Sequence, residues 1–305
     1  MVKENADSRV DIDEVLAFAI QLARDAGDLI REGQAGIFKS QSVAQTKANA
    51  VDLVTEVDKA VEAFIFGRIR AAYPQHQFIG EETYHGQVIS DKPTWIAWSS
   101  PIDGTTNFIH GYPMAATSIG LAVGGVPVVG VVYNPFLNML YSAGAGRGAY
   151  LNQTTRLPIT GKPRPLADLG HALISVDIGG SRRPSVLSSR LRTFEKLAGE
   201  PEFGGKMVHS LRSIGCASLN ICQVASGGQD MHWEIGAGIC ILTEAGGAAF
   251  GGKHTALTGE VDRKLIVGRK YLFVRNIAPG PGETGLEVQR QFATQFYDLT
   301  DDIEP

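Results

Sequence analysis

The chain is organised around one stretch, Ser99-Ser100-Pro101-Ile102-Asp103-Gly104-Thr105-Thr106-Asn107-Phe108. An apolar run from Pro93 to Trp98 precedes it and is typical of a buried strand near its end. Pro101 ends the strand, and Gly104 permits a sharp turn from which the Asp103 carboxylate projects. The residues after Gly104 begin a helix, whose unpaired N–H groups attract an anion such as phosphate. On its own the stretch could equally be a plain turn and a helix start.

Composition limits the classes of protein to which the chain can belong. Its 305 residues are 44% hydrophobic and 20% charged, which is typical of a globular protein with a large core. We expect an N-terminal α+β half at 1–160 and a C-terminal α/β half at 161–305. The net charge of −4 gives no reason to expect a nucleic acid or an anionic membrane as partner.

The expected compartment follows from the N-terminus and the cysteines. No apolar run approaches the roughly 20 residues of a membrane span, and the polar N-terminus has no secretory core. The three cysteines are an odd number without zinc spacing, which indicates buried thiols in a reducing compartment. We therefore expect a cytoplasmic protein.

Two further acidic segments follow strand-like runs. Asp58 comes after Val51 to Val57, and the adjacent Glu81 and Glu82 come after Phe78-Ile79-Gly80. Asp58 could simply be an acid in the first turn of a helix, and paired acids often lie in solvated loops. At the ends of buried strands, however, the cost of desolvating carboxylates favours a bound cation. With Asp103 they form three acidic groups that suit Mg²⁺ and metal-assisted attack of water on a phosphate ester.

Periodicity predicts the remaining elements that matter for the site. We expect a first helix over Asp11 to Glu32 and a strand over Lys264 to Val267. We also expect Ser213 to cap a helix that runs from about Ile214 to Ala225. A further strand is expected over Asp230 to Glu234, followed by a helix over 238–244.

Together these motifs resemble the inositol monophosphatase superfamily. The resemblance rests on Asp52 to Asp58, Gly80 to Thr83, Pro101 to Phe108 and Thr243 to Gly247. It extends over nearly the whole chain and is nearest to fungal members related to quinate-utilisation phosphatases. It implies a five-layer αβαβα sandwich, a homodimer, and a Mg²⁺-dependent, Li⁺-inhibited phosphomonoesterase that acts on a small phosphate ester.

The resemblance also implies roles for individual residues. Glu81 and the carbonyl of Ile102 would hold a first metal ion, and Asp103 a second. Thr105 and Asp58, assisted by Glu82, would orient the attacking water. The remaining residues would bind substrate: the amides of Gly104, Thr105 and Thr106 the phosphate, and the segments of Ser213 and Glu234 the alcohol.

Two departures from the family pattern affect the second metal ion. Ser100 stands where the family has an aspartate that bridges both ions, and the spacing from Trp95 is longer. Relatives also carry a Trp-Asp pair whose aspartate completes the second site. Here either Trp233-Glu234 replaces that pair, or a short segment containing it is deleted, which we prefer. Loss of one such electrostatic group costs about 2.7–4 kcal/mol in catalysis, so we expect weak or absent phosphatase activity at ordinary Mg²⁺.

A second interpretation is a repurposed or impaired family member, for example one from a fungal metabolic cluster. Such a protein would bind a small ligand, or carry out non-hydrolytic chemistry, in the old pocket. Trp98, His232 and Trp233 could line a more apolar pocket, although aromatic side chains of this kind more often pack in a core. Both irregularities are also of the size that misplaced splice sites produce.

Overall fold

The computed structural model describes residues 10–40, 45–46, 53–80, 90–97, 101–234, 238–266, 268 and 270–301. The elements up to residue 156 are α1 (Ile12–Ser40), β1 (Gln45–Thr46), β2 (Leu53–Val54), α2 (Glu56–Ala72), β3 (Gln77–Gly80), β4 (Thr94–Ala97), α3 (Thr105–His110), β5 (Thr117–Val123), β6 (Val126–Asn134), β7 (Met139–Gly144), β8 (Gly148–Leu151) and β9 (Thr155–Arg156). Those that follow are β10 (Leu173–Val176), α4 (Pro184–Ala198), β11 (Ser210–Arg212), α5 (Ala217–Ser226), β12 (Met231–Glu234), α6 (Ile239–Glu244), β13 (Ala248–Phe250), α7 (Arg263–Ile266), β14 (Tyr271–Val274) and α8 (Gly285–Leu299). Short 3-10 turns lie at Leu169–His171 and Pro201–Phe203.

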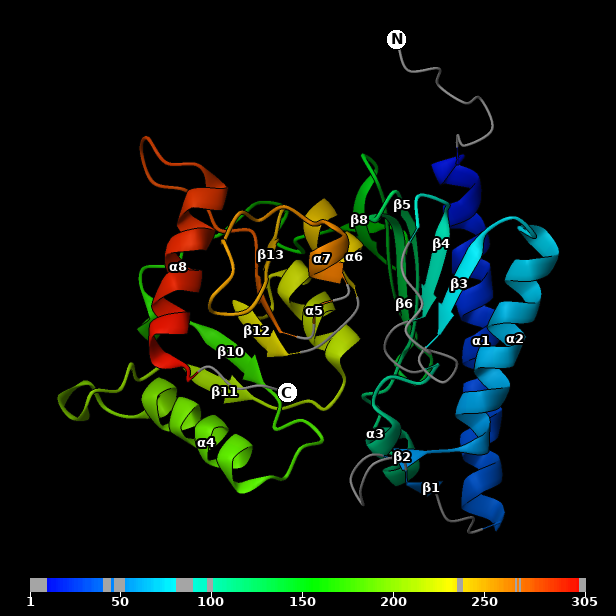
Figure 1. The fold of residues 1–305 in the computed structure, drawn as a ribbon, viewed down its shortest axis with the longest axis horizontal. Coiled ribbons are helices and arrows are strands. Elements are labelled where there is room, and N and C mark those ends of the chain that lie inside the picture. Colours follow the sequence, from blue (N-terminus) through cyan, green and yellow to red (C-terminus); the bar gives the residue numbers. More distant parts are fainter. Residues whose placement is uncertain are drawn as a thin grey trace.

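Two mixed sheets and three helical layers build the molecule (Figure 1). The first sheet has seven strands in the order β3-β4-β5-β6-β7-β8-β9, and the second has five in the order β11-β10-β12-β14-β13. Helices α1 and α2 cover the outer face of the first sheet, α5 and α6 lie between the sheets, and α4 and α8 cover the second. The expected five-layer αβαβα sandwich is confirmed.

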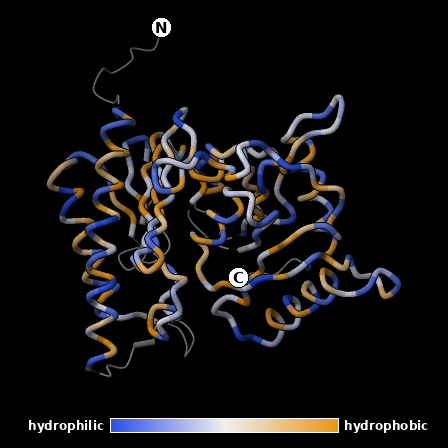
Figure 2. Tube along the Cα trace, turned by 180° about the vertical axis from the view of Figure 1, so that it is seen from behind, coloured by the Kyte–Doolittle hydropathy of each residue, from blue (hydrophilic) through white to orange (hydrophobic). Residues whose placement is uncertain are grey.

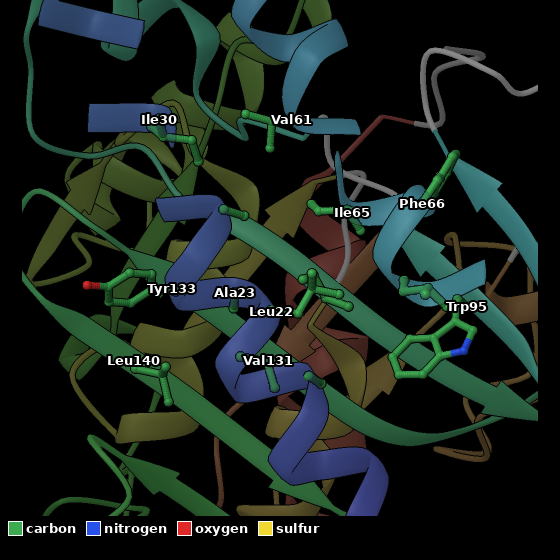
Figure 3. Packing of buried hydrophobic residues seen from close by; sticks show 14 of the residues in the cluster. Leu22, Ala23, Ile30, Val61, Ile65, Phe66, Trp95, Val131, Tyr133 and Leu140 are labelled. Carbon is green, nitrogen blue, oxygen red and sulfur yellow. The ribbon is translucent and has the colours of Figure 1, made fainter. Parts of the chain in front are cut away.

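Helix α1 is held by an apolar stripe that packs on the first sheet. Leu22, Ala26 and Ile30 recur at helical spacing and are fully or almost fully buried. Figure 3 shows this stripe against side chains of α2 and the strands. Along α1 and α2 hydrophobic residues recur at intervals among hydrophilic ones, as in an amphipathic helix (Figure 2). The helix ends at Ser40 and not at Glu32, because Ile37 continues the stripe against the same core.

The strand predicted over Lys264 to Val267 is wrong for the residues that the structure describes, which exclude Val267. Residues 263–266 form the helix α7. The Asp262 carboxylate accepts a hydrogen bond from the Leu265 N–H at 2.7 Å, which stabilises the start of a helix. The buried Ile266 then packs on Ile79 of the first sheet.

The glycine-rich turn between β7 and β8 receives a carboxylate from α6. Oxygens of Glu244 accept hydrogen bonds from Gly146 N–H at 2.9 Å and Gly148 N–H at 2.8 Å. Both glycines have positive φ, of 71° and 79°, which turns their N–H groups toward one acceptor. Glu244 therefore fastens the helical layer between the sheets to the first sheet.

Among the described helices, none combines the length and the hydropathy that a membrane span requires.

Replacement of Glu244 by alanine should lower the free energy of unfolding by about 1–3 kcal/mol, because two charge-assisted hydrogen bonds are lost. Urea unfolding of both proteins measures the difference. Glu195→Ala is the matched control, because Glu195 is an exposed acid in the last turn of α4. An equal effect of the two variants would contradict the proposed role of Glu244.

Candidate functional site

Three parallel strands of the second sheet end at the same edge. Strand β10 pairs in parallel with both β11 and β12, so the chain leaves all three strands in one direction. In open α/β sheets ligands bind beside such carboxyl ends. The segment after β11, 213–216, lies against the turn that contains Asp103, because the Asn107 side chain bonds two of its carbonyls. The candidate site is therefore a junction between the two sheets.

Asp103 is fixed through its backbone and through its side chain. Its N–H and C=O exchange hydrogen bonds of 2.8 and 3.0 Å with Ala116. Its Oδ2 accepts a hydrogen bond of 2.6 Å from the Ser218 N–H in the first turn of α5. A carboxylate at that place also favours the positive end of the helix dipole. One oxygen of Asp103 thus joins the first sheet to the central helical layer.

Gly104 lets the chain turn where other backbone segments approach it closely. Its φ is +85°, a conformation that side-chain-bearing residues rarely adopt. A Cβ at Gly104 would lie 2.8 Å from the Met114 carbonyl oxygen and 3.2 Å from that of Gly215. The expected sharp turn is present, and no other residue type fits it without a shift of backbone.

Asn107 and Cys216 tie the same turn to the segment after β11. The Asn107 Nδ2 donates to the carbonyls of Met114 at 2.7 Å and Ile214 at 2.8 Å. The Cys216 Sγ lies 3.4 Å from the Asp103 carbonyl oxygen, to which it donates. Burial, and then the charge of Asp103, raise the pKa of the Cys216 thiol well above its usual range. The thiol is therefore a protonated donor and not a nucleophile.

Asp58 and Thr105 approach each other beneath the turn. Asp58 is fully buried and completes a capping box with Thr55, so α2 begins two residues before Asp58. The Thr105 hydroxyl donates to the Ile102 carbonyl at 3.0 Å, and Asp58 Oδ1 lies 3.5 Å from the same hydroxyl oxygen. Asp58 therefore stabilises its helix and also faces the candidate site.

Most, but not all, of the expected site residues lie in the described part of the chain. The turn and its neighbours bring together Asp58, Ile102, Asp103, Gly104, Thr105 and Thr106. Glu81, Glu82 and Ser100 lie outside the described residues, and so does the side chain of Glu234, whose backbone ends β12. Within the described ranges no group of three or more His, Cys, Asp or Glu side chains could hold a metal ion.

Ser213 does not cap a helix, contrary to the sequence-based expectation. Helix α5 begins at Ala217 with Cys216 as its N-cap residue, because Gly215, at φ +72°, turns the chain just before it. The Ser213 hydroxyl instead donates to Asp177 Oδ1 at 2.6 Å. Asp177 was missed as a site residue, although it follows the apolar strand β10 just as the other acids follow theirs.

His232 and Trp233 belong to the packing of the second sheet. His232 is fully buried, stacks on Phe273, and lies 2.8 Å from the Ser175 hydroxyl through Nδ1. Burial lowers the pKa of His232 to about 4, so the ring is neutral at pH 7. Trp233 contacts the Phe296 ring edge to face and carries the Arg190 guanidinium over its own ring. Both side chains therefore have the core role that was the simpler expectation.

Sequence comparison gives one consistent result. Residues 11–291 match the inositol monophosphatase family. Protein qutG of Emericella nidulans is 38% identical over 312 residues, covering 95% of this chain and 94% of that protein. Inositol monophosphatase 2 of Saccharomyces cerevisiae is 42% identical over 304 residues, covering 95% and 96%. Inositol monophosphatase 1 of Homo sapiens is 36% identical over 279 residues, covering 87% and 93%.

Solved structures agree with the sequence relatives. Mycobacterium tuberculosis SuhB superposes with a TM-score of 0.68 at 25% identity, covering 95% of this chain and 99% of that one. A staphylococcal enzyme, SaIMPase-II with inositol monophosphate bound, gives a TM-score of 0.64 at 28% identity, covering 93% and 95%.

Gly104→Ala should destabilise the protein by more than Gly124→Ala. Both glycines have positive φ, but Gly124 has open space around its Cβ position, whereas Gly104 meets backbone oxygens. The strained conformation alone costs roughly 1–2 kcal/mol, and displaced backbone at Gly104 adds to that cost. Urea unfolding of both variants tests this, and equal losses would contradict the close approach of backbone oxygens to Gly104.

His232 should make the protein less stable in acid. In the unfolded chain a histidine binds its proton near pH 6.5, whereas folded His232 does so only near pH 4. The unfolded state therefore gains protons first, and about 3 kcal/mol of stability is lost as the pH falls through that window. Urea unfolding at pH 7 and pH 4.5 should show a smaller loss for His232→Asn than for the wild type. Equal losses would show that His232 titrates normally.

Proposed function

Because the chain belongs to the inositol monophosphatase family, we propose that it is a Mg²⁺-dependent phosphomonoesterase with a weakened second metal site. The observation that carries the proposal is the Thr105 hydroxyl, 3.0 Å from the Ile102 carbonyl and 3.5 Å from the buried Asp58 carboxylate. Thr105 directly follows Asp103-Gly104, at the junction of the sheets.

The oxygen atoms that the described residues offer are of the type that a small hard cation prefers as ligands. Asp103 supplies a carboxylate and Ile102 a carbonyl oxygen, and Mg²⁺ prefers such oxygen ligands. We propose that the Ile102 carbonyl, with Glu81, would hold a first ion and that Asp103 would hold a second. When bound, such ions would supply charge neutralisation and a more acidic water. The Asp103–Ser218 hydrogen bond already fixes the orientation of that carboxylate, so little reorganisation is needed.

Thr105 is proposed to orient the attacking water. Its single hydroxyl proton is directed at Ile102 O, so its oxygen retains lone pairs that accept a hydrogen bond from the water. Asp58, with Glu82, would then receive the proton that the water loses as it attacks phosphorus. The N–H groups of Gly104, Thr105 and Thr106 would bind the phosphate oxygens.

A weakened second site is proposed on the two altered segments. Ser100 provides a neutral hydroxyl where the family has a bridging carboxylate. Strand β12 includes Trp233-Glu234, and α6 begins at Ile239 after the N-cap residue Gly238. Gly238 has no side chain that could bind a metal ion. This short connection supports the alignment in which the Trp-Asp pair is absent. Asp103 would then be the remaining described carboxylate for a second ion.

The substrate and setting follow the relatives. SaIMPase-II has been solved with inositol monophosphate and with 2'AMP, both small phosphate esters. We propose a small phosphate ester as substrate, with a homodimer as the assembly and the cytoplasm as the location.

The alternative is a repurposed pocket that binds a ligand without hydrolysing it. The loss of the bridging carboxylate at Ser100 favours this alternative. Ser100→Asp separates the two readings. If that single change alone restores strong phosphate release, the pocket is a weakened phosphatase and not a redesigned one.

Phosphate release from inositol, sugar and nucleotide monophosphates at high Mg²⁺ tests the proposal. The wild type should show measurable release, and Thr105→Ala should lower kcat/KM by roughly a hundredfold or more, because the water loses its acceptor. Thr105→Ser should retain most of the activity.

Thr255→Ala is the control, because Thr255 is exposed and far from the turn in sequence. Release that is undetectable in the wild type for every ester, or unchanged in Thr105→Ala, would contradict the proposed activity.

A further inference from the structure

A chain of buried polar side chains ends at the rim of the candidate site. It runs from His232 through Ser175, Gln229 and Asn220 to Asp177. Asp177 is 4% exposed, and its two carboxylate oxygens accept from three donors. Asn220 Nδ2 lies 2.8 Å from Oδ2, whereas Ser213 Oγ and Gly215 N lie 2.6 and 3.1 Å from Oδ1.

The hydrogen bonds that end on Asp177 have a fixed direction, and the other side chains can be arranged consistently with it. The neutral His232 ring can donate through Nδ1 to Ser175, whose hydroxyl donates to Gln229 Oε1 at 2.6 Å. The Gln229 amide must therefore present its NH₂ to Asn220 Oδ1, and the Asn220 NH₂ faces Asp177. A carboxylate only accepts, so all donors point toward Asp177.

The consequence appears at Ser213, which is exposed and lies at the carboxyl end of β11. Its one hydroxyl proton is committed to Asp177, so the oxygen offers only lone pairs to anything that enters the site. The neighbouring Ile214 and Gly215 carbonyls are held by Asn107, so this oxygen has a fixed place beside the Asp103 turn.

We infer that Asp177 is a positioning residue that sets substrate specificity: it holds Ser213 as an acceptor that selects alcohols carrying a free hydroxyl. This inference rests on the proposed function for the site. It adds which kind of group the site recognises on the alcohol part of the substrate, namely a hydrogen-bond donor. A substrate hydroxyl donates to Ser213 Oγ, whereas an ether or an alkyl group leaves that oxygen without a partner. Sites built in this way discriminate against analogues that lack the donor.

Three phosphate esters with the same carbon skeleton test whether the wild-type protein prefers a substrate that carries a hydroxyl donor. Glycerol 2-phosphate has hydroxyl donors, its di-O-methyl ether has acceptors alone, and isopropyl phosphate has neither. With Mg²⁺ present, calorimetric affinity and phosphate release should both favour glycerol 2-phosphate over the other two by roughly three- to tenfold. The ether and isopropyl phosphate should be similar. An ether that matches glycerol 2-phosphate would overturn the inference.

Variants assign the effect to the two residues. Ser213→Ala should remove most of the preference, and Ser213→Thr should keep it. Asp177→Asn keeps its amide oxygen toward Ser213 and the Gly215 N–H, so the preference should persist in that variant. Asp177→Ala removes this acceptor and frees the Ser213 proton, so the ether should gain relative to isopropyl phosphate. Asp168→Asn, an exposed acid in the same half, should change nothing. An unchanged preference in Ser213→Ala would overturn the inference even if Asp177→Ala failed to fold.

The two readouts separate the inference from the proposed function. Preserved binding preference without phosphate release would refute the phosphatase and leave the role of Asp177 intact. Phosphate release without any preference would refute the role of Asp177 and leave the phosphatase intact. Failure of all three probes to bind would overturn both.

Discussion

The site depends on one carboxylate that serves two parts of the protein. Asp103 joins its backbone to Ala116, which directly precedes β5 of the first sheet, and its Oδ2 accepts from the Ser218 N–H at the start of α5. The proposed cation ligand is therefore also the contact that sets the distance between the two sheets at the site. A substitution of Asp103 would disturb binding and the junction together, so its effects cannot be read as loss of a ligand alone.

Carboxylates held by backbone N–H groups recur where the layers meet. Glu244 fixes the β7–β8 turn, Asp177 fixes the segment after β11, and Asp103 fixes α5. Each acceptor satisfies backbone N–H groups of a turn, a loop or a helix start, and the Ser218 N–H among them is buried. Such contacts are directional, so they orient the layers in a way that apolar packing alone would not. The position of the site is then a consequence of how the sandwich is assembled.

The layered fold was expected from the family resemblance of the motifs, whereas the Asp103 turn and the first helix could be predicted from local signals. The strand before Pro101, the glycine after Asp103 and the amphipathic first helix are each visible within about ten residues. Ser213 and Asp177 could not be assigned in this way, since their partnership joins residues 36 positions apart through tertiary packing. The strand expected over 264–267 failed for a related reason: Asp262 supplies a helix start that outweighs the β-branched residues after it. Asp58 carried two interpretations, and the structure supports its capping role while placing it beside Thr105.

The central claim is that a cation and an oxyanion bind next to each other at the Asp103 turn. If they do, each must increase the affinity of the other by the same factor. Calorimetric titration of the protein with Mg²⁺, with and without inorganic phosphate, measures this coupling directly. The account predicts tighter Mg²⁺ binding when phosphate is present, and loss of that coupling in Asp103→Asn. Mg²⁺ binding that does not respond to phosphate, in a protein that remains folded, would contradict it.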